Sequence, residues 1–326
     1  MFSFFRSLFR RPAPIVRSGS RRQASTVQRP STKVGLTPRQ GWARRNFLVD
    51  VLLPSLFRAR EGKLNQVVLP QLKPGQLSIT WIGHASFLIR TPHRNILIDP
   101  NWARWLKVIK RLRQPGMNLH DLPSIDLVLV SHAHFDHLDK RTLRAVAADQ
   151  PIVVPLGVGN LVHRLGFKQV HELETWHSYE DDDVKVTLTP CHHWGARVLH
   201  DAHRGFGGFV IEFGGHTIYH CGDSAYFDGF RSIGEQFSID YALMPIGAYD
   251  PPSGRSVHMT PEEVVRAFLE LGAKTLVPMH YGSFRLSFEP VNEPLSRLWV
   301  ASELAGIADR IMILLEGEIQ VLGEET

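Results

Sequence analysis

The 326-residue chain has only two cysteines, Cys191 and Cys221, which excludes a disulfide framework as the basis of the fold. It also lacks an apolar run of the roughly 18 residues that a membrane-spanning helix requires. The most apolar candidate, residues 42–57, is interrupted by Asp50 and Pro54. Near the N-terminus, apolar residues are interleaved with arginines, so the continuous apolar region of a secretory signal peptide is missing as well. We therefore expect a soluble or peripheral protein.

Acidic residues are absent before Asp50, whereas the same segment contains ten arginines and Lys33. The segment therefore has a formal charge of +11, and the rest of a chain whose net charge is +5 has a charge of −6. Because the basic character is concentrated in this segment, the pI of about 9.3 says little about a substrate. The composition of residues 1–40, rich in Arg, Ser, Pro and Gln, predicts a disordered arm.

The most informative stretch is His-Ala-His-Phe-Asp-His at residues 132–137, which places four potential metal ligands directly after an apolar run at residues 125–131. Imidazole nitrogens and carboxylate oxygens suit zinc and similar divalent ions. Ligands at positions i, i+2, i+4 and i+5 cannot all face one ion from a regular strand or helix. The loop is therefore predicted to divide them between two adjacent metal sites.

Three more apolar, strand-like runs end in residues with the same chemistry. Residues 184–190 lead into a pair of histidines at 192 and 193, residues 217–221 lead into Asp223, and residues 275–279 lead into His280. Catalytic groups often lie just past the carboxyl ends of buried strands in layered α/β proteins. We therefore expect four strands to deliver seven ligands to one site that holds two metals.

These motifs resemble the metallo-β-lactamase superfamily, and within it the N-acylphosphatidylethanolamine-hydrolysing phospholipase D family with its bacterial relatives. The resemblance implies an α/β fold, the αβ/βα four-layer sandwich, and a hydrolase with two Zn²⁺ ions, iron or manganese being alternatives. It covers about residues 77–322 and is carried by Trp-Ile-Gly-His-Ala-Ser-Phe (81–87), Ile-Asp-Pro (98–100), Gly-Asp-Ser-Ala-Tyr (222–226), Pro-Ile-Gly-Ala-Tyr (245–249), His-Met-Thr-Pro-Glu-Glu (258–263) and Met-His-Tyr-Gly-Ser-Phe (279–284).

The resemblance also implies which residues hold the ions. Three histidines are expected to hold one ion, an aspartate and two histidines the other, and a second aspartate bridges them: His132, His134 and His193; Asp136, His137 and His280; and Asp223. The residues alone do not choose between His192 and His193, whereas the family pattern, in which the ligand precedes Trp194, favours His193.

Three residues are expected to take part in catalysis: Asp136, Asp223 and His258. Asp136 is expected to orient the nucleophile in addition to its role as a ligand. The resemblance places His258 beside the substrate, where it is expected to contact phosphate or donate a proton. His84 is expected to be a hydrogen-bonded histidine and not a ligand.

A pass along the chain agrees with a layered fold. Strands are expected up to residue 98 and again at 151–155 and 184–189, with helices near 140–148 and 159–165. Residues 208–220 are typical of a hairpin with glycines at its turn. Thr-Pro-Glu-Glu at 260–263 is a capping box, which predicts a helix that ends at Gly272.

The chain is divided into three parts by these observations: the arm at residues 1–40, an N-terminal packing segment at 41–70, and a catalytic domain at 71–326. The packing segment is expected to contact the domain or a second subunit, which leaves a homodimer open. The arm resembles a mitochondrial transit peptide, a membrane-contacting segment through residues 1–11, or a solvated tail. We expect a cytoplasmic or peripherally membrane-associated protein, mitochondrial if it is eukaryotic.

Residues 101–113 are both basic and aromatic. Their apolar side chains recur at helical spacing among five basic residues: Trp102, Trp105, Leu106, Ile109 and Leu112 among Arg104, Lys107, Lys110, Arg111 and Arg113. This pattern predicts an amphipathic helix that contacts a phospholipid surface near the site. The alternative is an ordinary surface helix whose apolar stripe packs on the domain.

Two adjacent divalent ions can lower the pKa of a shared water and direct the resulting hydroxide at an electrophile, so hydrolysis is the expected reaction. The first hypothesis is a phosphodiesterase that acts on N-acylphosphatidylethanolamine or a related phospholipid. The second is a hydrolase of a small soluble phosphoester, ester or lactone, as the related ascorbate-phosphate lactonases are. The third is a nucleic-acid phosphodiesterase, because related nucleases share the metal loop and the basic arm can contact phosphates, although no RNA-binding motif is found.

Overall fold

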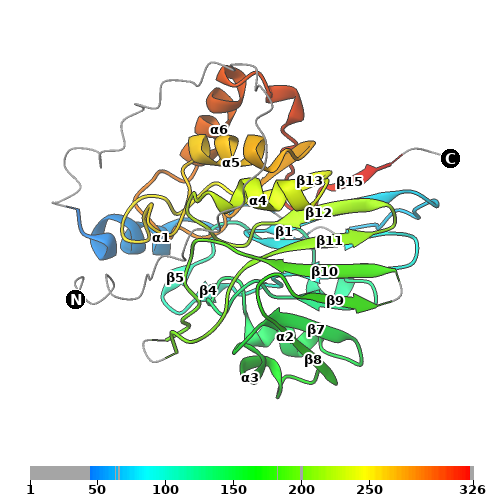
Figure 1. The fold of residues 1–326 in the computed structure, drawn as a ribbon. Helices are drawn as coiled ribbons and strands as arrows, with labels where there is room; N and C mark the ends of the chain where they lie inside the picture. The colour runs from blue at the N-terminus through cyan, green and yellow to red at the C-terminus, as the bar shows by residue number, and fades with distance from the viewer. Residues whose placement is uncertain (1–44, 63, 65–66, 182, 199–200, 324–326) are drawn as a thin grey trace. The chain divides into compact units, whose positions relative to one another are not determined.

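The structure is a computed structural model that describes residues 45–62, 64, 67–181, 183–198 and 201–323 (Figure 1). These residues belong to one compact unit, residues 41–326. The predictions for the arm at residues 1–40, including membrane contact through residues 1–11, lie outside the described residues. Within the described ranges, every helix is too short or too polar to traverse a bilayer.

The first of two large sheets has seven strands in the order β15-β1-β2-β3-β6-β7-β8. Its first half is antiparallel, whereas β3, β6, β7 and β8 pair in parallel. Of these, β3, β6 and β7 are short, mostly apolar and buried, as expected for strands covered on both faces, whereas the edge strand β8 is polar and largely accessible. The strands are β1 (Leu77–Gly83), β2 (Ser86–Arg90), β3 (Asn95–Ile98), β6 (Leu127–Leu129), β7 (Pro151–Pro155), β8 (Gln169–Leu173) and β15 (Ile319–Leu322).

The second large sheet has six strands in the order β14-β13-β12-β11-β10-β9. Both β10 and β12 are antiparallel to β11, so they run in the same direction, and β13 and β14 continue that direction in parallel. The carboxyl ends of β10, β12 and β14 therefore meet at one edge. The strands are β9 (Ser178–Asp181), β10 (Val184–Thr189), β11 (Gly208–Phe213), β12 (His216–His220), β13 (Tyr241–Pro245) and β14 (Thr275–Met279).

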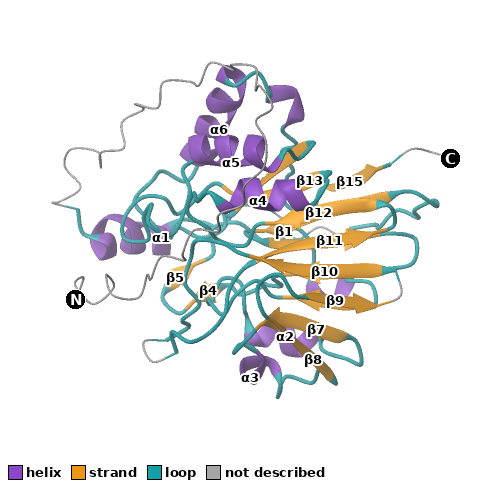
Figure 2. Ribbon diagram, in the orientation of Figure 1, coloured by secondary structure: helices purple, strands orange, loops and turns teal. Residues whose placement is uncertain are grey.

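Helices lie on the outer faces of the two sheets, and the sheets pack against each other (Figure 2). One core cluster joins Ile79 and Phe87 of the first sheet to Val186 and Phe209 of the second. A separate cluster places α2 and α3 against β6 and β7, and α4, α5 and α6 pack together over the second sheet. The predicted αβ/βα four-layer sandwich is confirmed. The helices are α2 (Lys140–Val146), α3 (Gly159–Val162), α4 (Gly229–Gln236), α5 (Pro261–Leu271) and α6 (Glu293–Leu304), with 3₁₀ turns η4 (Leu119–Asp121) and η5 (Ala308–Arg310).

Two local predictions are confirmed where short-range chemistry decides the backbone. The side chain of Thr260 accepts from the backbone N–H of Glu263, and the carboxylate of Glu263 accepts from the N–H of Thr260, which completes the capping box of α5. Gly272 ends that helix in the left-handed conformation at φ 65°. The hairpin of β11 and β12 turns at Gly214 and Gly215, which both have positive φ.

The prediction of a helix at residues 101–113 is wrong. The segment forms a two-stranded hairpin of β4 (Trp105–Leu106) and β5 (Ile109–Lys110), with Lys107 at φ 56° in the turn. The guanidinium of Arg111 donates to the carbonyls of Asn101 and Ala103, at 2.7 and 2.9 Å, and so occupies acceptors that a helix would use internally. Long-range burial of Arg111 therefore overrides the helical spacing of the apolar residues.

The N-terminal packing segment contributes a short helical element. A π-helical turn, η3 (Leu48–Leu52), leads into α1 (Leu53–Phe57). Pro54 has no backbone N–H, and its ring would clash with the carbonyl four residues earlier in a regular α-helix, which accounts for the widened turn before it. Val51 is fully buried, and the ring of Phe47 packs edge-on against Phe288 at 5.9 Å.

Candidate metal centre

The seven predicted ligands come together at one edge of the sandwich. The loop after β6 supplies four of them, and the carboxyl ends of β10, β12 and β14 supply the others: His132, His134, Asp136 and His137; His193; Asp223; and His280. All are buried except His134, which is half-buried. Strand direction explains the convergence, because the ligands of the second sheet follow strands that end at the same edge.

The first group consists of three histidines and one carboxylate. Nε2 of His132 lies 2.9 Å from Nδ1 of His134, which is 3.2 Å from Nε2 of His193. Oδ2 of Asp223 lies 3.9 Å from the His132 nitrogen and 3.8 Å from that of His193. One potential ligand atom from each of the four residues lies within 4.8 Å of the corresponding atoms of the other three.

The second group shares Asp223 with the first. Nε2 of both His137 and His280 lies 3.1 Å from Oδ2 of Asp223. The same two nitrogens lie 3.8 and 3.4 Å from Oδ2 of Asp136. His84 joins this group through a 2.9 Å contact between its Nε2 and Asp136 Oδ2. The loop spacing predicted that the ligands divide between two adjacent metal sites, and in the structure the same residues form two adjacent groups.

The structure places His193 in the first group and leaves His192 outside it. His193 is buried, and its Nδ1 lies 3.0 Å from the carbonyl of Val257, which can only accept a hydrogen bond. The proton therefore resides on Nδ1, and the lone pair of Nε2 faces the first group. His192 is exposed, and its backbone N–H donates to the Ser224 hydroxyl.

Asp99 is a site residue that spacing alone does not single out. It is fully buried with φ 43°, and its Oδ2 accepts from His137 Nδ1 at 2.7 Å and from the Ser131 hydroxyl at 2.6 Å. Because the carboxylate accepts a hydrogen bond from Nδ1–H and so keeps the proton on Nδ1, the lone pair of Nε2 of His137 faces the second group. The signal in the sequence is the Asp-Pro pair directly after a strand.

His84 supports Asp136 from behind. Its ring is buried and lies 4.0 Å, centroid to centroid, from the ring of His280. Burial and the positive charge that His280 can carry lower the pKa of His84 to about 3, although the hydrogen bond that His84 donates to Asp136 acts in the opposite direction. A neutral imidazole donates from Nε2 to Asp136, which agrees with the predicted hydrogen-bonding role.

Asn101 and Arg111 tie the hairpin segment to the metal loop. The Asn101 side chain donates to the carbonyls of Phe135 and Asp136, at 3.1 and 2.8 Å. The Arg111 guanidinium in turn holds the carbonyl of Asn101 and lies 4.7 Å from the ring centroid of Phe284. The predicted amphipathic helix included Arg111 among its basic residues, whereas the side chain is fully buried in the structure. The role of Arg111 in holding the hairpin segment can be recognised only from the three-dimensional structure.

His258 lies beside both groups. Its buried ring is 5.2 Å from the ring of His193 and 5.3 Å from that of His280. Together with Asp223 and His280 it forms a third set of potential ligand atoms. Burial lowers the pKa of His258 to about 4, so its imidazole is neutral. Its Nδ1 has no hydrogen-bond partner among the described residues.

The chemistry of the centre fits divalent cations. Burial opposes ionisation of Asp223, but His137 and His280 outweigh burial and hold its pKa well below the usual range. Burial likewise opposes the charged form of His280, yet Asp223 and Asp136 raise its pKa to about 9. Within the described residues, Asp223 Oδ1 and both ring nitrogens of His280 have no hydrogen-bond partner. Buried carboxylates and imidazoles that face each other in this way are a donor set for zinc, iron or manganese.

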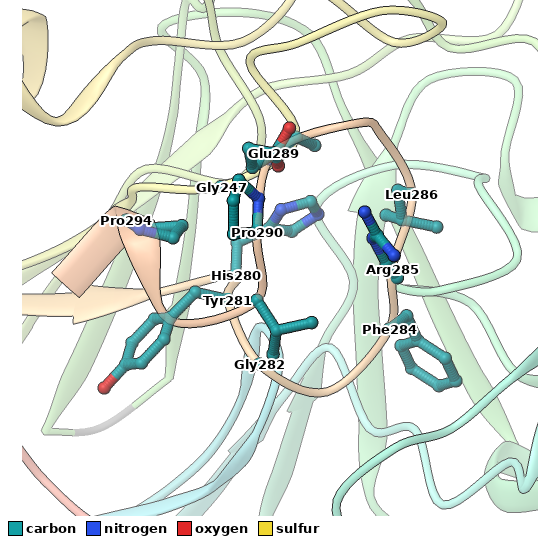
Figure 3. A pocket seen from close by; sticks show the side chains of 12 residues that line it. Gly247, His280, Tyr281, Gly282, Phe284, Arg285, Leu286, Glu289, Pro290 and Pro294 are labelled. Atoms are coloured by element: carbon teal, nitrogen blue, oxygen red, sulfur yellow. The ribbon is translucent and has the colours of Figure 1, made fainter. Parts of the chain in front are cut away.

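A small pocket is lined in part by His280 (Figure 3). Its lining includes Tyr281, Phe284, Arg285 and Glu289, and its volume is about 20 Å³. That is room for about one water molecule and excludes this pocket as a substrate site. The carboxylate of Glu289 accepts from the backbone N–H of Ala248 at 2.7 Å, which fixes the loop after β13.

Comparison with known proteins gives consistent matches. Residues 94–281 match the family model described as the beta-lactamase superfamily domain. An uncharacterized protein of Mycobacterium tuberculosis is 36% identical over 70% of this chain, and the match spans 64% of that relative's length. The N-acyl-phosphatidylethanolamine-hydrolyzing phospholipase D 1 of Caenorhabditis elegans is 32% identical, over 68% of each chain.

A solved structure gives the same result. Igni18, described as a novel metallo hydrolase of Ignicoccus hospitalis, superposes with a TM-score of 0.60 and 25% identity. The superposition covers 77% of this chain and 100% of Igni18.

Proposed function

Because the chain belongs to the metallo-β-lactamase superfamily and is a metal-dependent hydrolase, we propose that it is a dinuclear zinc phosphodiesterase of the phospholipase D type. Its proposed substrate is N-acylphosphatidylethanolamine or a related phospholipid. Hydrolysis would release phosphatidic acid and an N-acylethanolamine. The relative from C. elegans, whose name states this activity, supports the substrate class at 32% identity.

The observation that carries the proposal is the position of Asp223. Its Oδ2 lies within 3.1 Å of two histidine nitrogens in the second group and within 3.9 Å of two in the first. A carboxylate oxygen shared by two donor sets is suited to bridge two ions, which favours a dinuclear centre over a single ion.

Each group would hold one ion, the first through His132, His134 and His193 and the second through Asp136, His137 and His280, with Asp223 common to both. Two adjacent ions would supply an acidified water and neutralise charge on a phosphate group. The protein itself sets the ligand orientations. The carbonyl of Val257 and the carboxylate of Asp99 keep protons on the outer nitrogens of His193 and His137.

His258 and Asp136 are the residues that we assign to the substrate and nucleophile. The neutral imidazole of His258 can donate a hydrogen bond to a phosphate oxygen, whereas the low pKa that burial gives it disfavours the alternative role of proton donor. Asp136, held at 2.9 Å by His84, presents its carboxylate toward the second group, where it can orient a water molecule.

Basic residues at the metal loop favour an anionic substrate over a neutral lactone. Lys107 Nζ lies 4.4 Å from the ring centroid of Phe135, and the guanidinium of Arg197 lies 4.0 Å from it. Phe135 lies between two proposed ligands in the chain, and Arg197 also donates to the carbonyls of Ala133 and Leu138, so both cations lie against the metal loop. Positive charge at this position attracts a phosphodiester.

The test is identification of products by mass spectrometry after incubating the metal-loaded protein with N-acylphosphatidylethanolamine in mixed micelles. Asp223→Asn is the control, because it preserves size while weakening both groups. Phosphatidic acid and N-acylethanolamine are expected with the native chain alone. A fully metallated protein that leaves this lipid intact, yet hydrolyses soluble phosphoesters or lactones, would replace the proposal with the soluble-substrate alternative.

A further inference from the structure

We propose that η3, α1 and the β4–β5 hairpin form one docking face for an anionic lipid surface, directly beside the metal loop. This inference rests on the proposed function, since it explains how a hydrolase would reach a phosphodiester that stays in a membrane. The docking face is defined by its exposed apolar side chains: Leu48, Val49, Leu53, Leu56, Phe57, Trp105 and Val108.

The apolar side chains of the docking face point away from the domain. The side chain of Phe57 is 88% exposed and that of Val108 is 65% exposed. The opposite side of the helical element is anchored, because Val51 and Ser55 are buried. Large apolar side chains in solvent are unfavourable, and an interfacial helix places such a face in the headgroup region of a bilayer.

The two elements of the docking face are joined to each other. The ammonium of Lys110 donates to the carbonyls of Leu56 and Arg58, at 2.9 and 2.6 Å. The backbone N–H of Glu61 donates to the carbonyl of Leu112 at 2.8 Å. Figure 1 shows α1 next to β4 and β5, which agrees with these contacts. A joined surface can engage a membrane as one unit.

The charge of the docking face is complementary to an anionic membrane. Without the buried Arg111, residues 45–62 and 101–113 together contain seven basic and two acidic residues, whereas the whole chain has a net charge of only +5. Arg104 and Lys107 are exposed on the hairpin, next to the exposed apolar residues. Basic residues around an apolar face attract anionic lipids, with a contribution of about fivefold in binding for each cation near the surface.

The position of the docking face connects it to the metal centre. Lys107, at the tip of the hairpin, lies over the ring of Phe135 at 4.4 Å. Phe135 is flanked in the chain by His134 and Asp136, and Asn101 holds its carbonyl. A membrane bound to this face would therefore present lipid headgroups at the edge of the centre.

Another exposed apolar group lies on α6 and provides a matched control. Val300 and Leu304 are exposed there, Leu304 at 86%. That helix carries Glu293, Arg297 and Glu303 and thus has no basic excess. Comparing α6 with the docking face therefore separates the effect of exposed apolar area alone from the effect of apolar area combined with positive charge.

The experiment is co-sedimentation of the full chain with large unilamellar vesicles. One set contains phosphatidylcholine alone, and the other contains phosphatidylcholine with phosphatidylglycerol. The variants are Leu53→Ser with Phe57→Ser, Arg104→Gln with Lys107→Gln, and the control Leu304→Ser. We expect binding to the anionic vesicles to weaken by roughly tenfold or more in each test variant and to stay unchanged in the control. The native chain should bind neutral vesicles much less than anionic ones.

Several results would overturn the docking face. Undiminished binding of both test variants would assign any membrane affinity to another part of the chain, such as the basic residues 1–44. An unchanged affinity accompanied by a change of molar mass in light scattering would assign the same face to a second copy of the chain. Absence of vesicle binding by the native protein would contradict the proposal outright.

A second readout separates this proposal from the proposed function. The Leu53→Ser with Phe57→Ser variant, whose residues have no role in metal or phosphodiester binding, is assayed on the soluble diester bis(p-nitrophenyl) phosphate and on N-acylphosphatidylethanolamine in vesicles. Retained turnover of the soluble diester with reduced turnover in vesicles supports the docking face. Vesicle binding without turnover of either substrate would contradict the phosphodiesterase and leave the docking face supported.

Discussion

At the scale of residues, the centre is organised by what holds the outer nitrogen of each imidazole. His137 is held by Asp99 and His193 by the carbonyl of Val257, at 2.7 and 3.0 Å. His132 has its Nδ1 at 3.0 Å from the Ser131 hydroxyl. These partners set the tautomer and the direction of the inner nitrogen, so the ligand set is prearranged by the protein.

Asp99→Asn tests this prearrangement. The amide is nearly isosteric but presents a donor as well as an acceptor, so His137 loses its fixed tautomer. We expect roughly 10- to 100-fold weaker binding of one of the two ions, measured by competition with a chromophoric chelator. Asp126→Asn is the control, because that carboxylate accepts from Asn95 N–H away from the centre. Equal affinities in the two variants would show that Asp99 does not orient a ligand.

His258→Ala tests the assignment of that residue to the substrate. Since no ligand of either group depends on His258 for orientation, the variant should keep its metal content. Its turnover of the lipid substrate should fall by roughly 100-fold, the size expected for loss of a hydrogen-bond donor to the reacting group. His192→Ala, at an exposed position, should change neither quantity. Loss of metal from His258→Ala would instead make His258 a ligand.

The seven residues proposed as ligands can be picked out from the sequence because each follows a buried strand with characteristic spacing, and the structure brings them together. Adjacent histidines at 192 and 193 are not separable in this way, since only the fold shows which one turns inward. Asp99 acts through Ser131, 32 positions later in the chain. Arg111 acts through Asn101, 10 positions earlier. Side chains of that kind are recognised only once the loops are placed.

At the scale of elements, the predicted helices and strands agree best with the structure where local interactions determine the backbone conformation. β7, β10, β11, β12 and the start of α5 lie where alternation, glycine turns and the capping box predict them. The segment 101–113 differs, because its helical spacing competes with burial of Arg111 and the left-handed turn at Lys107. Tertiary contacts therefore decide an element whose local signals are weak.

Thr260→Ala tests the local origin of α5. Removal of the hydroxyl leaves the N–H of Glu263 without its cap, and the free energy of unfolding should fall by about 1 kcal/mol. Urea denaturation measures the change, with Ser296→Ala, on the exposed side of α6, as the control. Metal content should stay the same. An unchanged stability would show that packing of the buried face of α5 outweighs its cap.

At the scale of the whole molecule, the centre joins the two sheets. The first sheet supplies the loop after β6, and the second supplies His193, Asp223 and His280. The order of the sheets and their face-to-face packing follow from the family resemblance, whereas spacing alone does not place one sheet against the other. The boundaries at residues 40 and 70 and the compartment stay predictions.

Because the ions would connect both sheets, their removal should destabilise the whole domain. At free metal 100-fold above its dissociation constant, one bound ion contributes about 2.7 kcal/mol to stability. Dialysis against a chelator should therefore lower the melting temperature, and zinc should restore it. A melting temperature that is indifferent to chelation, in protein shown to have lost its metal, would mean that the ions do not hold the sheets together.

The count of metal ions per chain tests the dinuclear centre most directly. Elemental analysis of the purified zinc-loaded protein should find two ions per chain. The count should fall toward one in His193→Ala, which removes a ligand of the first group, and in His280→Ala, which removes one of the second. Asp223→Asn should weaken both, and His192→Ala should keep both. A native protein saturated by one ion, or a loss of metal in His192→Ala alone, would contradict the account.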